Sequence, residues 1–204
     1  MRPSVRTLLF FLSLFSIAWL ANAQARPTAT QPLRLSVFGG ATGADVGLAA
    51  TRNLGATAGI DAGFGSFFGL QPAIELRGTD AADGHVVSSE KNALIGIRIA
   101  HSFGRIQPYV DVLYGRGILY YGNGGYPNPA FTLLYTHTAG NIFSPGAGID
   151  LALTEHFSVK IYEQYQRVAT PVTASHVIYI TPLTFGVVYH FNFNRRPHID
   201  KRMP

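Results

Sequence analysis

Two residues of the chain have the spacing of a nucleophilic catalytic pair. His156 and Ser158 are separated by one residue, and Glu163 is the next carboxylate along the chain. A histidine that accepts the proton of a serine hydroxyl, oriented by a carboxylate, is the arrangement used for acyl transfer. The same spacing is more typical of a turn that leads into a strand. We therefore expect a turn at His156, and no catalytic residues.

Other groups that carry chemistry are scarce. The chain contains no cysteine, which excludes a disulfide scaffold, a thiolate metal site and a cysteine nucleophile. The remaining histidines lack metal-ligand spacing, and His85, His137 and His176 fall on three different predicted loops. The glycine-rich run at 122–125 does not precede a helix, so it indicates a loop rather than a phosphate site. We expect no metal and no cofactor.

The composition indicates a folded, apolar chain. Charged residues make up 13 % of the 204 residues, against about 25 % in an ordinary soluble domain. The net charge of +5 arises at the two ends, because the segment 24–193 holds 10 basic and 10 acidic residues. A nucleic-acid-binding surface needs a basic face, so we expect no nucleic acid as a partner.

The first 23 residues have the pattern of a secretory signal peptide. Two arginines in Met1–Arg6 precede the apolar run Thr7–Leu20, and Ala21-Asn22-Ala23 forms a small-x-small cleavage site. A membrane-spanning helix needs about 20 apolar residues, and this run is shorter. We expect residues 1–23 to be removed on export and the mature chain to begin at Gln24.

Short runs in 24–193 alternate between apolar and small or polar residues, which is the pattern of strands with one buried face. The pattern predicts eight strands, at 33–40, 54–64, 70–79, 92–103, 107–118, 142–153, 157–167 and 177–193. Long connections at 41–53, 80–91, 119–141 and 168–176 alternate with short ones at 65–69, 104–106 and 154–156. Residues 194–204 follow as a basic tail.

A soluble sandwich and a membrane barrel both show such alternation, and three features favour the barrel. The face opposite the apolar one carries glycines and single charges instead of many lysines and glutamates. Long outer loops alternating with short turns are typical of outer-membrane barrels. Aromatic residues gather near strand ends, as in two interfacial girdles: Phe64, Phe67, Phe68, Phe103, Tyr109 and Phe157, and Tyr114, Tyr120, Tyr121 and Tyr165. We predict an all-β fold, an eight-stranded antiparallel up-and-down transmembrane β-barrel.

Charged side chains are predicted to fill the lumen of this barrel. The inward set contains four basic and four acidic residues: Arg34, Asp61, Glu75, Arg77, Arg98, Asp111, Asp150 and Lys160. Buried charges persist when they are paired, so an ion network that plugs the lumen is favoured over a gated ion or proton path. Glu75 and Arg98 are the predicted cross-strand pair. Glu163 falls on the outward face, and a β-bulge near 161–164 is predicted to turn it inward.

The last predicted strand resembles the terminal strand of bacterial outer-membrane β-barrels. The residues that carry the resemblance alternate and end in phenylalanine: Leu183, Phe185, Val187, Tyr189 and Phe191. Residues 107–112 and 144–151 also look like strands of small OmpA- and OmpX-type barrels. The resemblance implies a location in the outer membrane of a Gram-negative cell. It also implies recognition by the barrel-assembly machinery, and outer-membrane lipid and lipopolysaccharide as surroundings.

The chain departs from this family in two respects. Asn192–Pro204 follow the terminal strand, so either Phe191 or Phe193 is the residue that the assembly machinery reads. No folded C-terminal domain follows, so the peptidoglycan anchoring of full OmpA-type proteins is not implied.

The connection 119–141 is the most distinctive predicted outer loop. Tyr120, Tyr121, Tyr126 and Phe131 are interspersed with glycine, asparagine and proline, a mixture that forms adaptable contact surfaces. These four residues are candidates for contact with an extracellular ligand. The alternative is a loop that folds over the barrel mouth, with Tyr135 extending the girdle.

These observations predict a non-enzymatic integral outer-membrane protein with a structural or cell-surface interaction role. A narrow pore is the first alternative. The second is a lipid A-modifying enzyme, because lipid A deacylases are small outer-membrane barrels with a His-x-Ser motif. The segment His156-Phe157-Ser158 resembles that motif but lacks the asparagine that follows in the family.

Overall fold

The computed structural model describes residues 33–48, 51–82 and 87–191. The predicted signal peptide, the basic tail 194–204 and Phe193 lie outside these residues. In the parts of the chain that the structure describes, no helix is long and apolar enough to cross a membrane.

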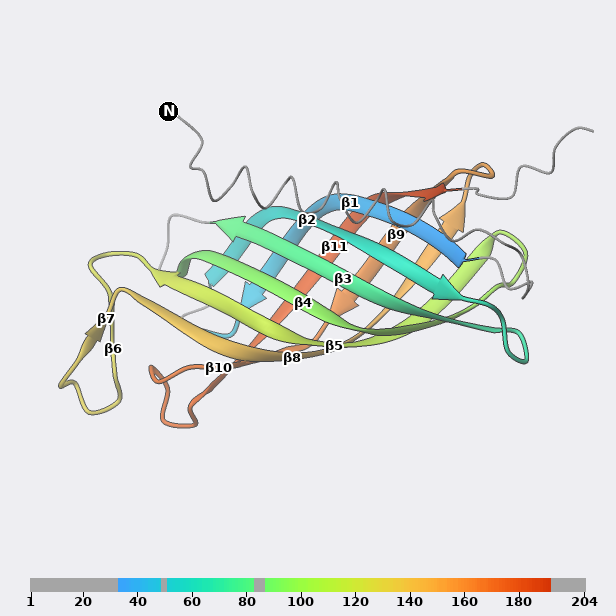
Figure 1. The fold of residues 1–204 in the computed structure, drawn as a ribbon. Helices are drawn as coiled ribbons and strands as arrows, with labels where there is room; N and C mark the ends of the chain where they lie inside the picture. The colour runs from blue at the N-terminus through green and yellow to red at the C-terminus, as the bar shows by residue number, and fades with distance from the viewer. Residues whose placement is uncertain (1–32, 49–50, 83–86, 192–204) are drawn as a thin grey trace, which may run out of the picture. The chain divides into compact units, whose positions relative to one another are not determined.

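Most of the described residues form one closed antiparallel sheet (Figure 1). Its strands are β1 (Leu33–Val46), β2 (Thr51–Phe64), β3 (Leu70–Ala82), β4 (Val87–His101), β5 (Ile106–Tyr121), β8 (His137–Ala152), β9 (Phe157–Gln164), β10 (Gln166–Ala169) and β11 (Val177–Phe191). β9 and β10 follow each other between β8 and β11, so they occupy one strand position. β1 pairs with β11 and closes the barrel, which confirms the predicted eight-stranded fold.

Most of the strands are longer than the sequence pattern predicted. β1 continues to Val46 and β5 to Tyr121, so the connections 41–53 and 119–141 shrink to 47–50 and 122–136. A transmembrane strand needs about 9–11 residues, whereas β5 and β8 have 16 each. The ladder of backbone hydrogen bonds continues past the apolar belt. The residues there are small or polar, so the alternation of apolar and polar residues does not reveal this part of each strand.

The register fixes the size of the barrel. Val37 pairs with Ile60, and successive partners lead through Leu76, Ile95, Tyr114, Phe143 and Arg167 to Tyr179. The Tyr179 carbonyl accepts a hydrogen bond from the amide of Gly47, ten positions beyond Val37 on the same chain segment. This stagger sets the strand tilt, and an eight-stranded barrel of this kind has an interior that side chains fill.

The predicted β-bulge near 161–164 is absent from the described strands. Gln164 lies opposite Gly146 and Arg167 opposite Phe143, so the register is unchanged across the gap between β9 and β10. Pro145 lies opposite Tyr165 in this register, and its missing amide hydrogen removes a donor from the ladder. Glu163 therefore stays on the outward face, contrary to the prediction.

The outward face is apolar around the barrel. Ile95, Ile97 and Val110 are 55–59 % exposed although they lie in the middle of strands. Exposed apolar area on this scale marks a lipid-facing surface. Aromatic side chains border the belt, with Phe64, Phe103 and Phe157 at one end and Tyr114 and Tyr165 at the other. Two girdle assignments were wrong, because Tyr109 and Tyr121 point inward and are buried.

Candidate functional site

The candidate site is the filled lumen together with its two ends. The short-turn end carries the connections 65–69, 102–105 and 153–156. The long-loop end carries the C-terminal ends of β1 and β3 and the connections 122–136 and 170–176. Seven of the eight predicted inward charges are buried and joined in ion pairs between these ends.

The first part of the ion network is centred on Arg77 of β3. Its guanidinium donates to Glu75, two residues away on the same strand face, with 2.7 Å between Arg77 Nε and Glu75 Oε1. It also donates to Asp111 of β5, with 3.1 Å between Nη2 and Oδ2. One guanidinium thus serves two carboxylates, which is the geometry that its planar fork of donors allows.

The second part of the ion network joins four strands. Arg98 of β4 donates to Asp150 of β8 and to Asp61 of β2, the latter at 3.4 Å. Lys160 of β9 donates to the same Asp61 oxygen at 3.3 Å. The predicted direct pair of Glu75 and Arg98 was wrong, because the register places Glu75 opposite Gly96 and Arg98 opposite Ala73.

Three aromatic rings lie among these charges. Lys160 Nζ is 3.8 Å from the centroid of the Phe38 ring, Arg98 Cζ is 4.0 Å from that of Tyr109, and Arg77 Cζ is 4.2 Å from that of Tyr162. Each cation therefore has a ring face in addition to its carboxylates. The inward direction of Phe38 and Tyr109 could have been predicted from the sequence. Each lies an even number of residues from a predicted inward charge on its own strand.

A row of hydroxyl groups lies next to the ion network towards the long-loop end. Thr184, Thr42, Thr57 and Thr79 come from four neighbouring strands, with Oγ1–Oγ1 distances of 2.8, 2.6 and 3.0 Å along the row. Sequence reasoning missed this row, because a threonine reads equally well as a surface or a lumen residue. Its hydroxyls hold one another across the strands on both sides of the barrel closure.

The long-loop half of the lumen contains a large apolar cluster, beside which Asn53, Glu90 and Gln166 are also buried. Leu94, Leu113, Ile142, Ile180 and Val46 belong to one cluster, and none exceeds 1 % exposure. Tyr121 belongs to the same cluster, and its hydroxyl lies 2.8 Å from that of Thr138. We call this cluster the apolar plug. The assignment of Tyr121 as a surface contact was therefore wrong.

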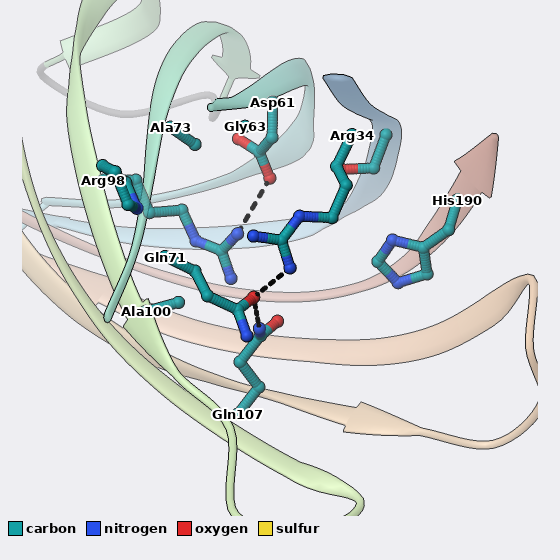
Figure 2. A pocket seen from close by; sticks show the side chains of 11 residues that line it. Arg34, Asp61, Gly63, Gln71, Ala73, Arg98, Ala100, Gln107 and His190 are labelled. Carbon is teal, nitrogen blue, oxygen red and sulfur yellow. Dashed lines mark hydrogen bonds and ion pairs between the residues drawn. The ribbon is translucent and has the colours of Figure 1, made fainter. Parts of the chain in front are cut away.

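The short-turn end contains a polar cavity of about 130 Å³ (Figure 2). Arg34 donates to Gln71 Oε1 at 2.8 Å and to the Gly65 carbonyl at 2.5 Å, and Gln107 donates to the same Gln71 oxygen at 2.7 Å. The prediction that Arg34 belongs to the ion network was wrong, since no carboxylate of the described residues pairs with it. Asp61 and Arg98 line the cavity, so the ion network forms its inner wall.

The short turn before β9 contains His156, as expected, and the His156-x-Ser158 spacing does not bring these two residues together. Ser158 points into the lumen, and its hydroxyl lies 2.9 Å from Nε2 of His190 on β11. The ring of His156 instead stacks on Tyr189, with 6.1 Å between centroids. Among the described residues, no three histidine, aspartate or glutamate side chains are grouped so that they could hold a metal ion.

The connection 122–136 carries a small hairpin of its own, β6 (Tyr126–Pro127) paired with β7 (Leu134–Tyr135). Asn128 shapes the turn, because its Oδ1 accepts from the amides of Thr132 at 2.8 Å and Leu133 at 3.1 Å. Phe131 adopts a φ of 54° and is 82 % exposed. Tyr126 packs on Tyr121 over the plug, and Tyr120 faces outward beside His137. Of the four predicted contact residues, only Phe131 projects from the hairpin.

The predicted assembly residues share one face of β11. Leu183, Phe185, Val187, Tyr189 and Phe191 all point outward, opposite the inward Thr184, Val188 and His190. β11 pairs with β1 on one side and with β9 on the other, so this face borders the closure of the barrel.

The architecture is similar to that of solved protein structures, although no family model and no curated protein matches the sequence. Among solved structures, Ail, the attachment invasion locus protein of Yersinia pestis, in complex with the heparin analogue sucrose octasulfate, superimposes with a TM-score of 0.53 at 12 % identity, over 78 % of this chain and 99 % of Ail. Neisserial surface protein A gives a TM-score of 0.50 at 16 % identity, over 77 % of this chain and 97 % of its own.

The chain has the fold of the small eight-stranded outer-membrane β-barrels. At these identities the likeness concerns the fold. In a small barrel of this kind, the ion network and the apolar plug occupy the lumen, and the polar cavity and the β6–β7 hairpin lie at its two ends.

Proposed function

We propose that this protein is an outer-membrane barrel with a closed lumen, and that it acts through contact at the cell surface. The apolar belt, the barrel fold and the predicted signal peptide support the location. In this orientation the short-turn end faces the periplasm and the long-loop end faces outward, as is usual for such barrels. The barrel-assembly machinery and outer-membrane lipid are its proposed partners during and after insertion.

The observation that carries the contact role is the hairpin. Phe131, Leu133 and Leu134 are 82 %, 58 % and 63 % exposed, beyond the strands that leave the lipid belt. A hydrogen-bonded turn holds them in place, because Asn128 fixes the amides of Thr132 and Leu133. Apolar side chains displayed on an ordered turn lose little conformational entropy on binding, which favours contact with an apolar or aromatic extracellular surface.

The filled lumen supports a closed barrel over a pore or an enzyme. The ion network spans the barrel between the polar cavity and the apolar plug, and each layer contains fully buried side chains. The role proposed for the lumen charges is structural, and no catalytic role is proposed for His156, Ser158 or His190.

Two measurements test this proposal. Unboiled and boiled samples should migrate differently on a gel in mild detergent, and the folded species should fractionate with outer membranes. Cells that express Phe131→Ser with Leu134→Ser should adhere less to polystyrene and to an epithelial layer than cells with the parent protein. Ala130→Ser, an exposed neighbour in the same turn, is the matched control. Equal adhesion by the double variant and the control would remove the contact role.

A further inference from the structure

Basic residues on the outward face differ in their pairing from strand to strand. On β2 and β4, Arg52 pairs with Asp45 at 3.8 Å and Lys91 pairs with Asp80 at 3.0 Å. On the following strands, Arg116 of β5 and Arg167 of β10 have no carboxylate partner among the residues that the structure describes. The rim of the belt therefore carries two uncompensated positive charges on the β5–β8–β10 side.

These two arginines flank an asparagine. Arg116 lies directly opposite Asn141 of β8, and Arg167 lies opposite Phe143, two residues after Asn141 on the same outward face. Strand spacing and rise place the two arginine Cα atoms about 12 Å apart. Arginine side chains can span half of that distance, so both guanidinium groups and the Asn141 amide can reach one anion.

Each polar residue lies two positions beyond an aromatic residue on the same outward face. Arg116 follows Tyr114, Arg167 follows Tyr165, and Asn141 lies just past Phe143 towards the long-loop end. Aromatic rings in a transmembrane barrel lie at the boundary between acyl chains and headgroups. The side chains of the two arginines and Asn141 therefore project laterally from the barrel wall at the depth of the lipid headgroups, where a lipid phosphate would be.

Two grooves on the outer wall meet at Arg116. One, of about 360 Å³, is lined by Asn141, Ala139, Ala169 and His176 as well as Arg116. The other, of about 550 Å³, is lined by Lys91, Ala93, Gly117 and Ile118 as well as Arg116. Several of the lining residues are alanine or glycine, which leaves room for an acyl chain or a sugar next to the positive charge.

We propose that Arg116, Asn141 and Arg167 bind a phosphate group of a phosphorylated glycolipid in the outer leaflet, with the grooves taking its sugar and an acyl chain. Arginine suits this role because its fork of donors binds phosphate oxygens in pairs. A lipid fits better than a soluble ligand because these side chains leave the wall laterally, beside the aromatic girdle. The proposal rests on the proposed outer-membrane location, but not on the role of the hairpin.

The test uses the full barrel in nanodiscs of phosphatidylcholine titrated with bisphosphorylated lipid A. Arg116→Gln with Arg167→Gln should weaken binding about tenfold or more, whereas Arg52→Gln should change it less than about twofold. Dephosphorylated lipid A should bind the parent protein as weakly as lipid A binds the double variant. Each variant should still fold, because Arg116, Arg167 and Arg52 lie outside the lumen. The difference in gel mobility between boiled and unboiled samples checks this.

Three results would overturn the site. The first is an equal loss with Arg52→Gln, and the second is unchanged binding by the double variant. The third is a tight, arginine-dependent complex with inorganic pyrophosphate or sucrose octasulfate combined with weak binding of lipid A, which would indicate a soluble anion as the ligand. Cell fractionation is read separately, so a protein found outside the outer membrane overturns the location and not the binding measurement.

Discussion

Arg77 and Glu75 lie two residues apart on the inward face of β3, and the Arg77 guanidinium donates to one Glu75 oxygen through both Nε and Nη2. Arg77 therefore makes its two-donor contact within one strand, and its cross-strand contact is to Asp111. The ion network holds four carboxylates and three cations. Cations are therefore fewer than carboxylates in this network, so losing one cation leaves more unpaired charge than losing one carboxylate.

Arg77→Met should destabilise the barrel more than Glu75→Gln does. Removing the cation leaves Glu75 and Asp111 buried without their partner, at a cost of about 3–5 kcal/mol in the free energy of unfolding. Glu75→Gln should cost less, because Arg77 keeps its contact with Asp111. Urea unfolding from lipid vesicles measures both values.

A double-mutant cycle separates the observed pair from the predicted one. Coupling between Glu75 and Arg77 should reach about 1–3 kcal/mol, as for residues in direct contact. Coupling between Glu75 and Arg98 should be smaller, because these two side chains bond different partners. A larger coupling for Glu75 and Arg98 would contradict this arrangement of the lumen.

The two halves of the lumen should differ in access to water. The absence of native cysteine makes single replacements unambiguous. Ala73→Cys places a thiol on the wall of the polar cavity, and Ala44→Cys places one in the apolar plug. A small charged methanethiosulfonate reagent should label the first and leave the second unlabelled, and planar bilayers with the parent protein should show no conductance. Labelling of both thiols, together with steady conductance, would favour the narrow pore.

The outward pattern of β11 should control assembly. Tyr189 and Phe191 stack edge to face, with 4.9 Å between ring centroids, on the strand that closes the barrel. Changing both to aspartate should lower the amount of folded protein in the outer membrane, because it removes the aromatic pattern and places charge on the lipid face. Phe193→Asp alone should have a smaller effect if Phe191 is the residue that is read. Membrane fractionation with the gel-mobility assay measures both variants.

Periodicity predicted the strands because alternation reports directly on two-sided burial. All eight strands of the barrel and the inward direction of the seven network charges follow from parity alone. Parity does not give the register between strands, so it could not show that Arg98 reaches Asp61 and Asp150 while Glu75 bonds Arg77. Register depends on where each ladder of hydrogen bonds begins, which the turns decide.

Predictions from the sequence were wrong for residue types that occur both inside the barrel and on its outer surface. Tyr121 reads as an interfacial aromatic, yet its hydroxyl finds Thr138 inside the barrel. Likewise, Glu163 was expected to avoid lipid through a bulge. The described strands have no bulge there. The register is unchanged across the gap after β9, where Pro145 lies opposite Tyr165.

Replacing Glu163 should stabilise the barrel. This side chain is exposed on the outward face next to Ala147 and Leu183, within the apolar belt. A lipid-facing carboxylate carries a penalty that grows towards the membrane centre, so Glu163→Gln should raise the free energy of unfolding by about 1 kcal/mol. Glu155→Gln, in the short turn before β9, serves as the control and should have little effect. A loss of stability in Glu163→Gln would indicate a cationic partner at this position.

Two neighbouring glycines at the closure of the barrel should respond differently to a methyl group. Gly40 of β1 lies opposite Gly186 of β11, and a Cβ atom on Gly40 would lie 2.3 Å from the Phe185 carbonyl oxygen and 2.6 Å from the Gly186 Cα. A Cβ atom on Gly39, on the outward face, would meet only the Thr57 carbonyl oxygen at 3.9 Å.

The backbones of β1 and β11 would have to separate to admit Gly40→Ala, because the contacting atoms are main chain and cannot rotate away. That separation lengthens hydrogen bonds at the seam where the sheet closes, so the free energy of unfolding should fall by about 1–3 kcal/mol. Gly39→Ala should stay within about 0.5 kcal/mol of the parent protein. Urea unfolding from vesicles compares the two, and equal stabilities would show that the strands at the seam are not packed as closely as this register requires.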